Sequence, residues 1–429
     1  HDPLRFADLP GWFWVAGTRV LMGTQRYIFS EGKNDFTVKR ILLFLCLLLT
    51  ACQPAEDLPI SFTPTVTPVL SVATDTPISP TLFTETPASL PTIPASVVEL
   101  DGAEIQPGFS LIRFADVPRP TAIAFDSSGR MFVTSQDGNV YLVTDENADG
   151  RADGSSIFAS GYTFALGIAI HEPTGDIYVS HQGVISVLRD DNRDNVVDGE
   201  RIFAGDLPFG LHQNDNLEFG PDGLLYIGVG STCDACEDTN PQSAAILRFN
   251  VETGEREIFA TGLRNPFDVA FHPDTGELFG TDNGRDKLGM DIPLEELNHI
   301  IQGGDYGYPD CWDAGDQPGC EHSIPAVAFF EAHSSANGVV FYKGNNFPAE
   351  YRGNAFVTIF GSWLKAGVQT GIQRVILSKQ GNSYTGETSW FVKFPQGVMP
   401  LPLELGPDEM LYVGDYINGV IYRITYGVP

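Results

Sequence analysis

DNLEFGPDGLLYIGV, residues 215–229, determines the fold class that we predict for this chain. Apolar and polar residues alternate on both sides of a central Gly-Pro-Asp-Gly turn. Alternation gives a strand one apolar face, and a short turn rich in Gly, Pro and Asp reverses the chain between two such strands. The stretch therefore predicts a β-hairpin.

The same phrase recurs along the chain between residues 105 and 429. The other copies begin at Thr121, Leu166, Phe267, Asn337 and Leu401. The first copies are about 45 residues apart, which leaves room for two more short strands in each repeat. A hairpin with two further strands is one blade of a β-propeller, so six copies predict an all-β, six-bladed propeller whose loops converge on a central channel. Little helical periodicity separates the copies, which excludes a TIM barrel, and the repeated hairpin argues against a large sandwich.

The segment before the repeats has a different composition. Residues 38–52, VKRILLFLCLLLTAC, combine a basic start with a short apolar core, which is typical of a signal peptide. The ending resembles the lipoprotein box, so we expect Cys52 to be lipidated and residues 1–37 to lie upstream of the true start. The alternative is a genuine long N-terminus with a membrane-buried segment. Residues 53–104 are rich in Thr and Pro and are interpreted as an extended linker.

The charge of the chain restricts its partners. Its 429 residues include 25 basic and 55 acidic side chains, a formal net charge of −30. Such a field disfavours nucleic acid and anionic membrane surfaces, so contact with a membrane is expected only through the lipid anchor. Cations are favoured partners.

Two acidic loops, one repeat apart, have the spacing of the first half of an EF-hand calcium loop. The oxygen-bearing residues are Asp145, Asn147, Asp149 and Asp153 in the first loop and Asp190, Asn192, Asp194 and Asp198 in the second. Gly150 stands at the tight turn of the first loop, and Asn195 replaces it in the second. Neither loop has the bidentate Glu at the twelfth place. The two interpretations are a weak structural Ca²⁺ site and a solvated turn.

Four cysteines lie in the repeat region. An even number in an exported protein suggests disulfides, and local pairing of Cys233 with Cys236 and of Cys311 with Cys320 costs the least loop-closure entropy. A zinc site with four cysteines is the alternative, although such sites usually contain two CxxC pairs.

Four longer segments resemble the soluble quinoprotein sugar dehydrogenases, the glucose/sorbosone dehydrogenase family, and among them the sorbosone branch most. The segments are residues 212–236, 262–309, 338–363 and 419–426. The resemblance implies a six-bladed propeller that uses pyrroloquinoline quinone (PQQ) and Ca²⁺ to oxidise a sugar or aldose-type alcohol or aldehyde. Within the second segment we expect a short helical phrase around the Glu-Glu-Leu-Asn run, followed by a Gly-Gly-Asp-Tyr-Gly-Tyr-Pro turn.

The resemblance also implies a role for individual residues. His212 falls at the place of the general base. The implied contacts of the cofactor are Arg264, Asn265, Arg285, Trp363 and Lys365. The resemblance implies that the backbone carbonyls of Gly284 and Arg285 hold the cofactor's Ca²⁺. The acidic pair Glu295 and Glu296 is implied to lie near a second, structural metal. Ca²⁺ prefers such hard oxygen ligands, and a histidine titrating near neutrality can accept the proton of a sugar hydroxyl.

Two positions depart from the family pattern. Leu364-Lys365 stands where the family usually has Asn-Arg, and Val398-Met399-Pro400 stands where it often has Gly-Arg-Pro. Lysine keeps the charge without the bidentate fork of arginine, and methionine removes a charge.

Taken together, the repeats, the signal-like segment and the resemblance predict an extracytoplasmic, membrane-anchored sugar dehydrogenase that passes electrons to a respiratory-chain acceptor or a quinone. The alternatives are a calcium-dependent lactonase and a non-catalytic cell-surface binding propeller.

Overall fold

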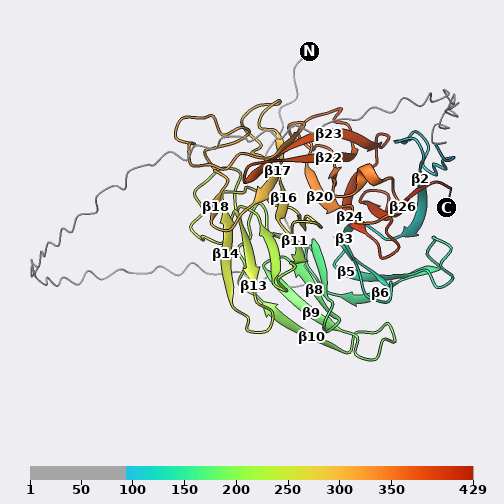
Figure 1. The fold of residues 1–429 in the computed structure, drawn as a ribbon. Helices are drawn as coiled ribbons and strands as arrows, with labels where there is room; N and C mark the ends of the chain where they lie inside the picture. The colour runs from blue at the N-terminus through green and yellow to red at the C-terminus, as the bar shows by residue number, and fades with distance from the viewer. Residues whose placement is uncertain (1–92, 429) are drawn as a thin grey trace, which may run out of the picture. The chain divides into compact units, whose positions relative to one another are not determined.

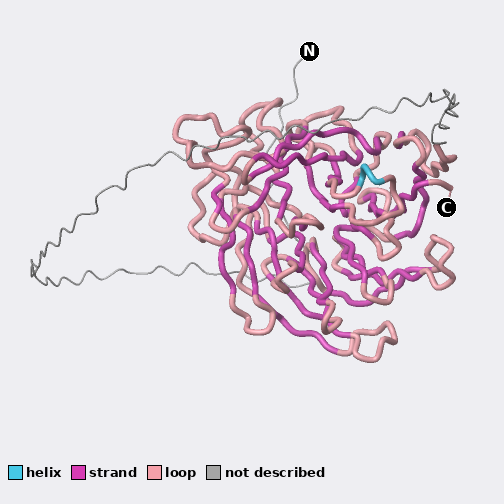
Figure 2. Tube along the Cα trace, in the orientation of Figure 1, coloured by secondary structure: helices cyan, strands magenta, loops and turns pink. Residues whose placement is uncertain are grey.

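The computed structural model describes residues 93–428, so the predictions for residues 1–37, for the signal peptide, for Cys52 and for most of the linker lie outside the described residues. The described chain consists of strands joined by turns, with one short 3₁₀ helix, η1 (Ala349–Tyr351). Figure 2 shows this predominance of strands and loops. No helix in residues 93–428 has the length and apolarity needed to cross a membrane.

The strands form six sheets, which are the six predicted blades (Figure 1). The first three blades run in chain order. The first contains β3 (Pro120–Phe125), β4 (Met131–Ser135), β5 (Asn139–Thr144) and β6 (Gly154–Ser160). The second contains β7 (Gly167–His171), β8 (Asp176–His181), β9 (Val184–Arg189) and β10 (Gly199–Ala204). The third contains β11 (Asn214–Phe219), β12 (Leu225–Val229), β13 (Ala245–Phe249) and β14 (Arg256–Thr261), with β18 (Gly304–Asp305) added in parallel.

The last three blades include two strands from the N-terminal end of the described chain. The fourth contains β15 (Val269–Phe271), β16 (Leu278–Asp282), β17 (Glu295–Ile300) and β19 (Ala328–Phe330). The fifth contains β20 (Ala336–Phe341), β21 (Ala355–Ile359), β22 (Gly371–Gln380) and β23 (Ser383–Lys393), with β1 (Glu104–Ile105) at its edge. The sixth contains β24 (Pro400–Leu405), β25 (Leu411–Asp415), β26 (Val420–Tyr426) and β2 (Phe109–Asp116).

Each of the six repeated phrases forms the first two strands of one blade, so the predicted hairpins are confirmed. The first strand of each blade contacts the first strand of the next, and β24 contacts β3, so these strands form a closed ring. Strand β2 pairs antiparallel with β26 and joins the two ends of the described chain in one blade. Phe109 and Leu111 of β2 are fully buried, which contributes about 1.5–3 kcal/mol for each side chain.

The expected helical phrase is wrong. Residues 295–300 form strand β17, which pairs with β16 on one side and β19 on the other. Five of the six residues are buried, including the apolar Leu297 and Ile300, and this burial between neighbouring strands outweighs the local helix propensity of the Glu-Glu-Leu run. The strand direction matters for the site because consecutive side chains of a strand point to opposite faces.

Ordered contacts begin earlier than the predicted boundary at residue 105. The backbone nitrogen of Glu99 donates to the Leu111 carbonyl, and Val98 forms a parallel bridge with Leu111. The last residues of the predicted linker therefore run beside β2 as part of the propeller.

Candidate active site

A cavity of about 510 Å³ opens at one end of the ring of inner strands. All six blades contribute to its wall, through Gln136, Leu166, His212, Asn265, Trp363 and Tyr416 in chain order. The inner strands β3, β11, β20 and β24 each have an irregular register at their first residues. Such bulges redirect side chains at strand ends, and here the irregular ends border the cavity.

His212 lies just before β11 and is held through its Nδ1 atom. This atom is 3.1 Å from both the carbonyl and the hydroxyl oxygen of Ser231. The Ser231 hydroxyl donates to the Cys233 carbonyl at 2.7 Å. A carbonyl oxygen only accepts, so the Nδ1 proton is the one donated to Ser231 and Nε2 is left as an acceptor. Nε2 has no hydrogen-bond partner within residues 93–428.

Burial keeps His212 uncharged. Desolvation, followed by the nearby Arg264 charge, lowers the pKa of His212 to about 3. A neutral imidazole with a free Nε2 can accept a proton without first losing one. The close packing around it requires a glycine, because a Cβ at Gly230 would lie 2.4 Å from the His212 Cβ and 2.6 Å from the Asn265 Oδ1.

Arg264 reaches the cavity with its charge already balanced. Its Nη2 atom is 3.0 Å from the Asp234 carboxylate and 3.0 Å from the Asp286 carboxylate. Its Nη1 atom donates to the Asn283 carbonyl at 3.2 Å. The side chain is 5% exposed, so the pairs are shielded from water.

Two amide oxygens at the cavity wall have no partner. The Oδ1 atoms of Asn265 and Asn283 are buried without a hydrogen bond among the described residues. The Asn283 amide nitrogen donates to the Asn337 Oδ1 at 3.0 Å, which directs the Asn283 oxygen elsewhere. Buried polar atoms are nearly always satisfied, so two orphaned oxygens in one cavity indicate a missing electropositive partner.

Glu295 supplies a carboxylate at the same wall. Its Oε2 accepts from the Gly284 nitrogen at 2.7 Å, and its Oε1 accepts from the Ser335 nitrogen at 3.3 Å. Burial raises the pKa of Glu295 to about 8. The amide oxygens of Asn265 and Asn283, the Glu295 carboxylate and the Gly284 backbone are hard ligands of the kind that Ca²⁺ binds. The residues present therefore fit a calcium ion.

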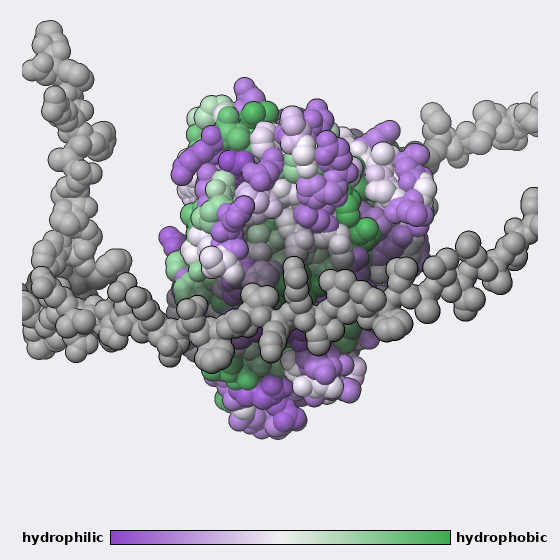
Figure 3. Space-filling model, turned by 90° about the vertical axis from the view of Figure 1, so that its left-hand side faces the viewer, coloured by the Kyte–Doolittle hydropathy of each residue, from purple (hydrophilic) through white to green (hydrophobic). Residues whose placement is uncertain are grey.

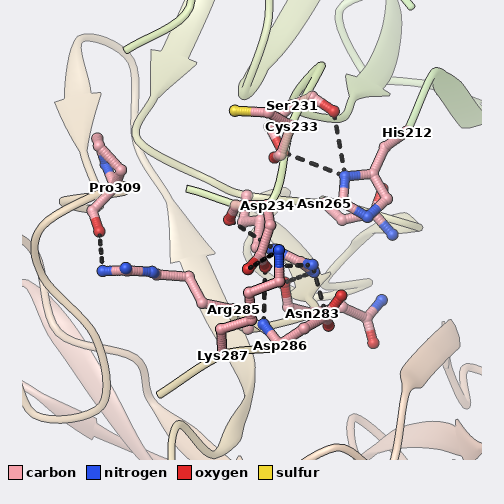
Figure 4. Close-up of polar contacts among 12 residues, drawn as sticks. His212, Ser231, Cys233, Asp234, Asn265, Asn283, Arg285, Asp286, Lys287 and Pro309 are labelled. Carbon is pink, nitrogen blue, oxygen red and sulfur yellow. Dashed lines mark hydrogen bonds and ion pairs between the residues drawn. The ribbon is translucent and has the colours of Figure 1, made fainter. Parts of the chain in front are cut away.

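Several predicted site residues do not line the cavity. Arg285 donates to the Pro309 carbonyl at 2.8 Å and stacks over Trp312, and Figure 4 shows it directed away from His212. Lys365 pairs with Asp291 at 3.2 Å and Glu331 at 3.1 Å. Glu296 follows Glu295 on β17, is absent from the cavity wall, and accepts from Asn298 at 3.1 Å. By contrast, Gly284 and Trp363 do line the cavity, and Trp363 is 73% exposed.

The two Asp-rich loops are separate from this cavity. In the first, the Asp145 carboxylate accepts from the Asp149 nitrogen at 3.2 Å and the Gly150 nitrogen at 2.9 Å. A surface hollow of about 600 Å³ beside this loop is larger than the cavity. It is lined by the first loop, by β5 and β6, and by Asn195 of the second loop, and it contains none of the predicted cofactor-binding or catalytic residues. In the second loop, the Arg130 guanidinium donates to Asp190 at 2.5 Å and to Asn195 at 3.0 Å. An arginine thus lies where the sequence suggested a metal.

Both predicted disulfides are present, Cys233–Cys236 and Cys311–Cys320. The first closes a tight loop that contains Asp234, one of the two partners of Arg264. Cys233, Cys236 and Asp238 are also close enough to hold a metal ion if the disulfide were reduced, but the four cysteines do not form a single zinc site.

The sequence interpretation missed several residues of the site. Asp234, Asp282, Asn283 and Asp286 surround Arg264 and Asn265, and Gln136 and Tyr416 complete the opposite side of the wall. The Asp282 carboxylate accepts from the backbone nitrogens of Arg264 at 3.0 Å and Asn265 at 2.6 Å. A signal for Asn283 was present, since a side-chain oxygen directly precedes the Gly284 that was selected. The repeat alone gave no such signal for Gln136 or Tyr416.

A family model described as "Domain of unknown function (DUF7133)" matches residues 98–424, which is most of the chain. An uncharacterised protein of Borreliella burgdorferi is 29% identical over 219 residues, covering 47% of this chain and 57% of that protein. The HIPL1 protein of Arabidopsis thaliana is 24% identical over 219 residues, covering 38% of this chain and 31% of that protein. The matched part of the chain thus spans about half of the length of the first relative and about a third of the second.

The propeller is similar to those of several solved structures. The calcium structure of the Trichoderma reesei carbohydrate-active enzyme of family AA12 has a TM-score of 0.67 at 19% identity, covering 77% of this chain and 98% of that one. The holo PQQ domain of Coprinopsis cinerea pyranose dehydrogenase has a TM-score of 0.65 at 17% identity, covering 77% and 99%. The PQQ-bound aldose sugar dehydrogenase of Streptomyces coelicolor has a TM-score of 0.58 at 18% identity, covering 75% and 99%. At these identities the likeness establishes that the chain has the fold of the PQQ-dependent sugar dehydrogenases.

Proposed function

The chain belongs to the DUF7133 family, and we propose that it is a quinoprotein dehydrogenase that oxidises a sugar or aldose-type hydroxyl, or an aldehyde hydrate, with PQQ and Ca²⁺. One observation carries the proposal. A neutral histidine with a free Nε2, an arginine and two orphaned amide oxygens meet in one cavity, at His212, Arg264, Asn265 and Asn283. The proposal agrees with the solved propellers of this fold that bind PQQ.

Ca²⁺ fits the oxygen-rich part of the wall. Asn265, Asn283, Glu295 and the Gly284 backbone would hold it, because each offers an oxygen at or beside the cavity. Binding would satisfy the two amide oxygens and would favour the ionised form of Glu295, whose burial otherwise raises its pKa to about 8.

A flat quinone fits the rest of the cavity. Phe360, Trp363 and Tyr416 provide aromatic faces, and Arg264 provides donors near His212. PQQ, when bound, supplies the acceptor for hydride that no amino-acid side chain supplies. The cofactor contacts that we keep from the sequence are therefore Arg264, Asn265 and Trp363, while Arg285 and Lys365 would need different side-chain positions.

His212 acts on the substrate hydroxyl. Its Nε2 accepts the hydroxyl proton while Nδ1 remains bonded to Ser231, so the developing imidazolium is held in one orientation. The exposed indole of Trp363 forms part of the mouth and offers a flat apolar surface, which suits the face of a sugar ring.

The lactonase and binding-propeller alternatives have less support. A calcium-dependent hydrolase would use several free side-chain carboxylates at the mouth. Here Asp286 is paired with Arg264, and Glu295 is bonded to two backbone nitrogens. A non-catalytic propeller would have no need for a buried histidine with a free Nε2 beside orphaned oxygens.

The cellular setting belongs to the same proposal. We infer an extracytoplasmic protein that Cys52 tethers to a membrane, with a small sugar as substrate and a respiratory-chain component or a quinone as electron acceptor. The two disulfides agree with an oxidising compartment. Mass analysis and membrane fractionation of wild type and Cys52→Ser test the anchor, and an unlipidated soluble wild type would contradict it.

Reconstitution tests the function directly. The purified chain is incubated with PQQ and Ca²⁺, and visible absorption is recorded before and after a panel of aldoses and polyols. We expect bound PQQ to be reduced by at least one sugar, chelator to prevent the reduction, and His212→Ala to slow it strongly. Binding without reduction by any sugar would remove the dehydrogenase assignment, and lactone hydrolysis without PQQ would favour the lactonase.

A further inference from the structure

Arg119 is an exposed cation that contacts two residues of the cavity wall and has no acidic partner among the described residues. Its Nη1 atom donates to the Gln136 Oε1 at 3.2 Å, and its guanidinium lies 5.8 Å from the centre of the Tyr416 ring. Gln136 and Tyr416 both line the cavity. Within residues 93–428 no carboxylate lies within ion-pair distance of Arg119, and its side chain is exposed.

The repeat places Arg119 at a defined position of the propeller. It precedes Pro120 at the start of the innermost strand of the first blade, as Asn265 precedes Pro266 in the fourth. Positions three blades apart in a six-bladed ring face each other across the channel. The equivalent residue of the fifth blade is Ser335, which lines the cavity. Both residues have a left-handed backbone conformation, with φ of 51° at Ser335 and 41° at Arg119.

The same comparison links Arg119 to a position where arginine is missing. In the sixth blade the residue before the strand is Met399, followed by Pro400. The Met399 carbonyl accepts from the Tyr416 nitrogen at 2.9 Å, so Met399 lies beside the residue on which the Arg119 guanidinium stacks. The Arg-Pro pair absent from the sixth blade is thus present one blade further around the ring.

The charge balance makes this arginine important for an anionic ligand. Arg264 is neutralised by Asp234 and Asp286, Lys365 by Asp291 and Glu331, and Arg285 is directed away. Hydrophilic residues cover much of the face in Figure 3, and the whole chain carries a net charge of −30. Of the arginines and lysines discussed for this site, Arg119 is the one whose charged group has no acidic partner among the described residues and also contacts wall residues, Gln136 and Tyr416.

We propose that Arg119, with Gln136 and Tyr416, forms a carboxylate-binding subsite that takes the place of the missing arginine at Met399. Gln136 Oε1 accepts from both Arg119 and the Tyr416 hydroxyl, which leaves the Gln136 amide nitrogen as a second donor. The subsite binds a carboxylate of the planar cofactor on the side of the cavity opposite Arg264. This inference rests on the proposed function.

The test measures cofactor binding separately from turnover. Wild type, Arg119→Gln and the control Arg193→Gln are titrated in Ca²⁺ with PQQ and with its uncharged trimethyl ester, and binding is followed by quenching of tryptophan emission. Arg193 is an exposed arginine without an ion pair within the described residues, so the control removes the same charge elsewhere. We expect Arg119→Gln to raise the Kd of PQQ about 10-fold, with no change for the ester or in the control.

The outcomes separate the two proposals. Equal PQQ affinity in Arg119→Gln and Arg193→Gln overturns the subsite and leaves the dehydrogenase assignment standing. The same conclusion follows if Arg119→Gln weakens the binding of the uncharged ester as much as it weakens the binding of PQQ. A wild type that binds no PQQ removes both. If Arg119→Gln does not fold, Met399→Arg is the second variant. It should tighten the binding of PQQ and not of the ester, and an unchanged affinity overturns the subsite.

Discussion

The cavity and the two Asp-rich loops are both rich in oxygen ligands, but their oxygens are in different states. In the cavity, Asn265 and Asn283 each keep a buried oxygen without a partner. In the first loop, Asp145 bonds to the loop's own backbone nitrogens, and in the second, Asp190 and Asn195 bond to Arg130. The number of carboxylates favours the loops as cation sites, whereas the buried oxygens without hydrogen-bond partners favour the cavity. The difference teaches that a cation site is better identified by what its oxygens lack than by how many there are.

Removing the base should give the largest effect on the cavity side of this comparison. We expect His212→Ala to slow sugar oxidation about 10²- to 10⁴-fold, since a positioned general base contributes that much. PQQ binding and thermal stability should change little. His322→Ala, an exposed histidine near Asp305, is the control. Equal rates for wild type and His212→Ala in steady-state assays would show that the histidine is not the base.

Calcium should stabilise the protein through the cavity more than through the first loop. A ligand at 100 times its Kd stabilises the native state by about 2.7 kcal/mol, so wild type should unfold at a higher temperature in Ca²⁺ than in chelator. Asn283→Ala should lose most of this shift, and the double variant Asp145→Asn, Asp149→Asn should keep most of it. Differential scanning fluorimetry measures both. The reverse ranking would break the comparison and make the loop the main site.

Removing the arginine should make the second loop resemble an unfilled site. Asp190 has 2% side-chain exposure and pairs with Arg130, so Arg130→Gln leaves a buried carboxylate unpaired and should destabilise the protein by about 1–3 kcal/mol. We expect millimolar Ca²⁺ to recover part of that loss. The midpoint of unfolding with and without Ca²⁺ gives the answer, and Arg193→Gln is the matched control. A loss that Ca²⁺ leaves untouched would mean that the loop does not bind calcium even when vacant.

The smallest expected effect concerns acid stability beside the same loop. Burial alone would raise the pKa of Asp126, but hydrogen bonds from Ser128 and Arg130 outweigh it and lower this pKa. A lowered folded-state pKa gives stability that is present above the unfolded value of about 3.9 and is lost as the pH falls through the folded value. Asp126→Asn should therefore weaken the pH dependence of stability below pH of about 4, with little change near neutrality. Urea unfolding across this range measures it, and parallel curves for the two proteins would refute the effect.

The fold was predictable because it repeats. Six hairpins with the same alternation and the same turn residues specify six blades without knowledge of any contact. The exception was residues 295–300, whose Glu-Glu-Leu run has local helix propensity and whose strand character depends on β16 and β19.

The sequence predicted where most residues of the candidate site lie on the backbone, but it predicted less well where their side chains point. His212, Arg264, Asn265 and Gly284 line the cavity, but Arg285 and Lys365 turn to partners that lie elsewhere along the chain. A sequence gives the place of a residue on the backbone, whereas the direction of a long side chain depends on which carbonyl or carboxylate the fold brings within reach. The sorbosone branch, the individual site roles and the loop calcium remain predictions.

The pairing of β2 with β26 has a consequence for how the chain acquires its structure. The Ser110 hydroxyl donates to the Gly427 carbonyl across 317 positions. This contact joins residues near both ends of the described chain, so it can form only after the blades between them have been made. Closing so long a loop costs entropy that is recovered only when the sixth blade forms. During synthesis β2 is made long before its partner β26, and until β26 follows, an apolar strand that includes Phe109 and Leu111 presents an open edge. The propeller can therefore complete its ring only after β26 has emerged, and β2 is the strand for which we expect assisted folding to be needed most.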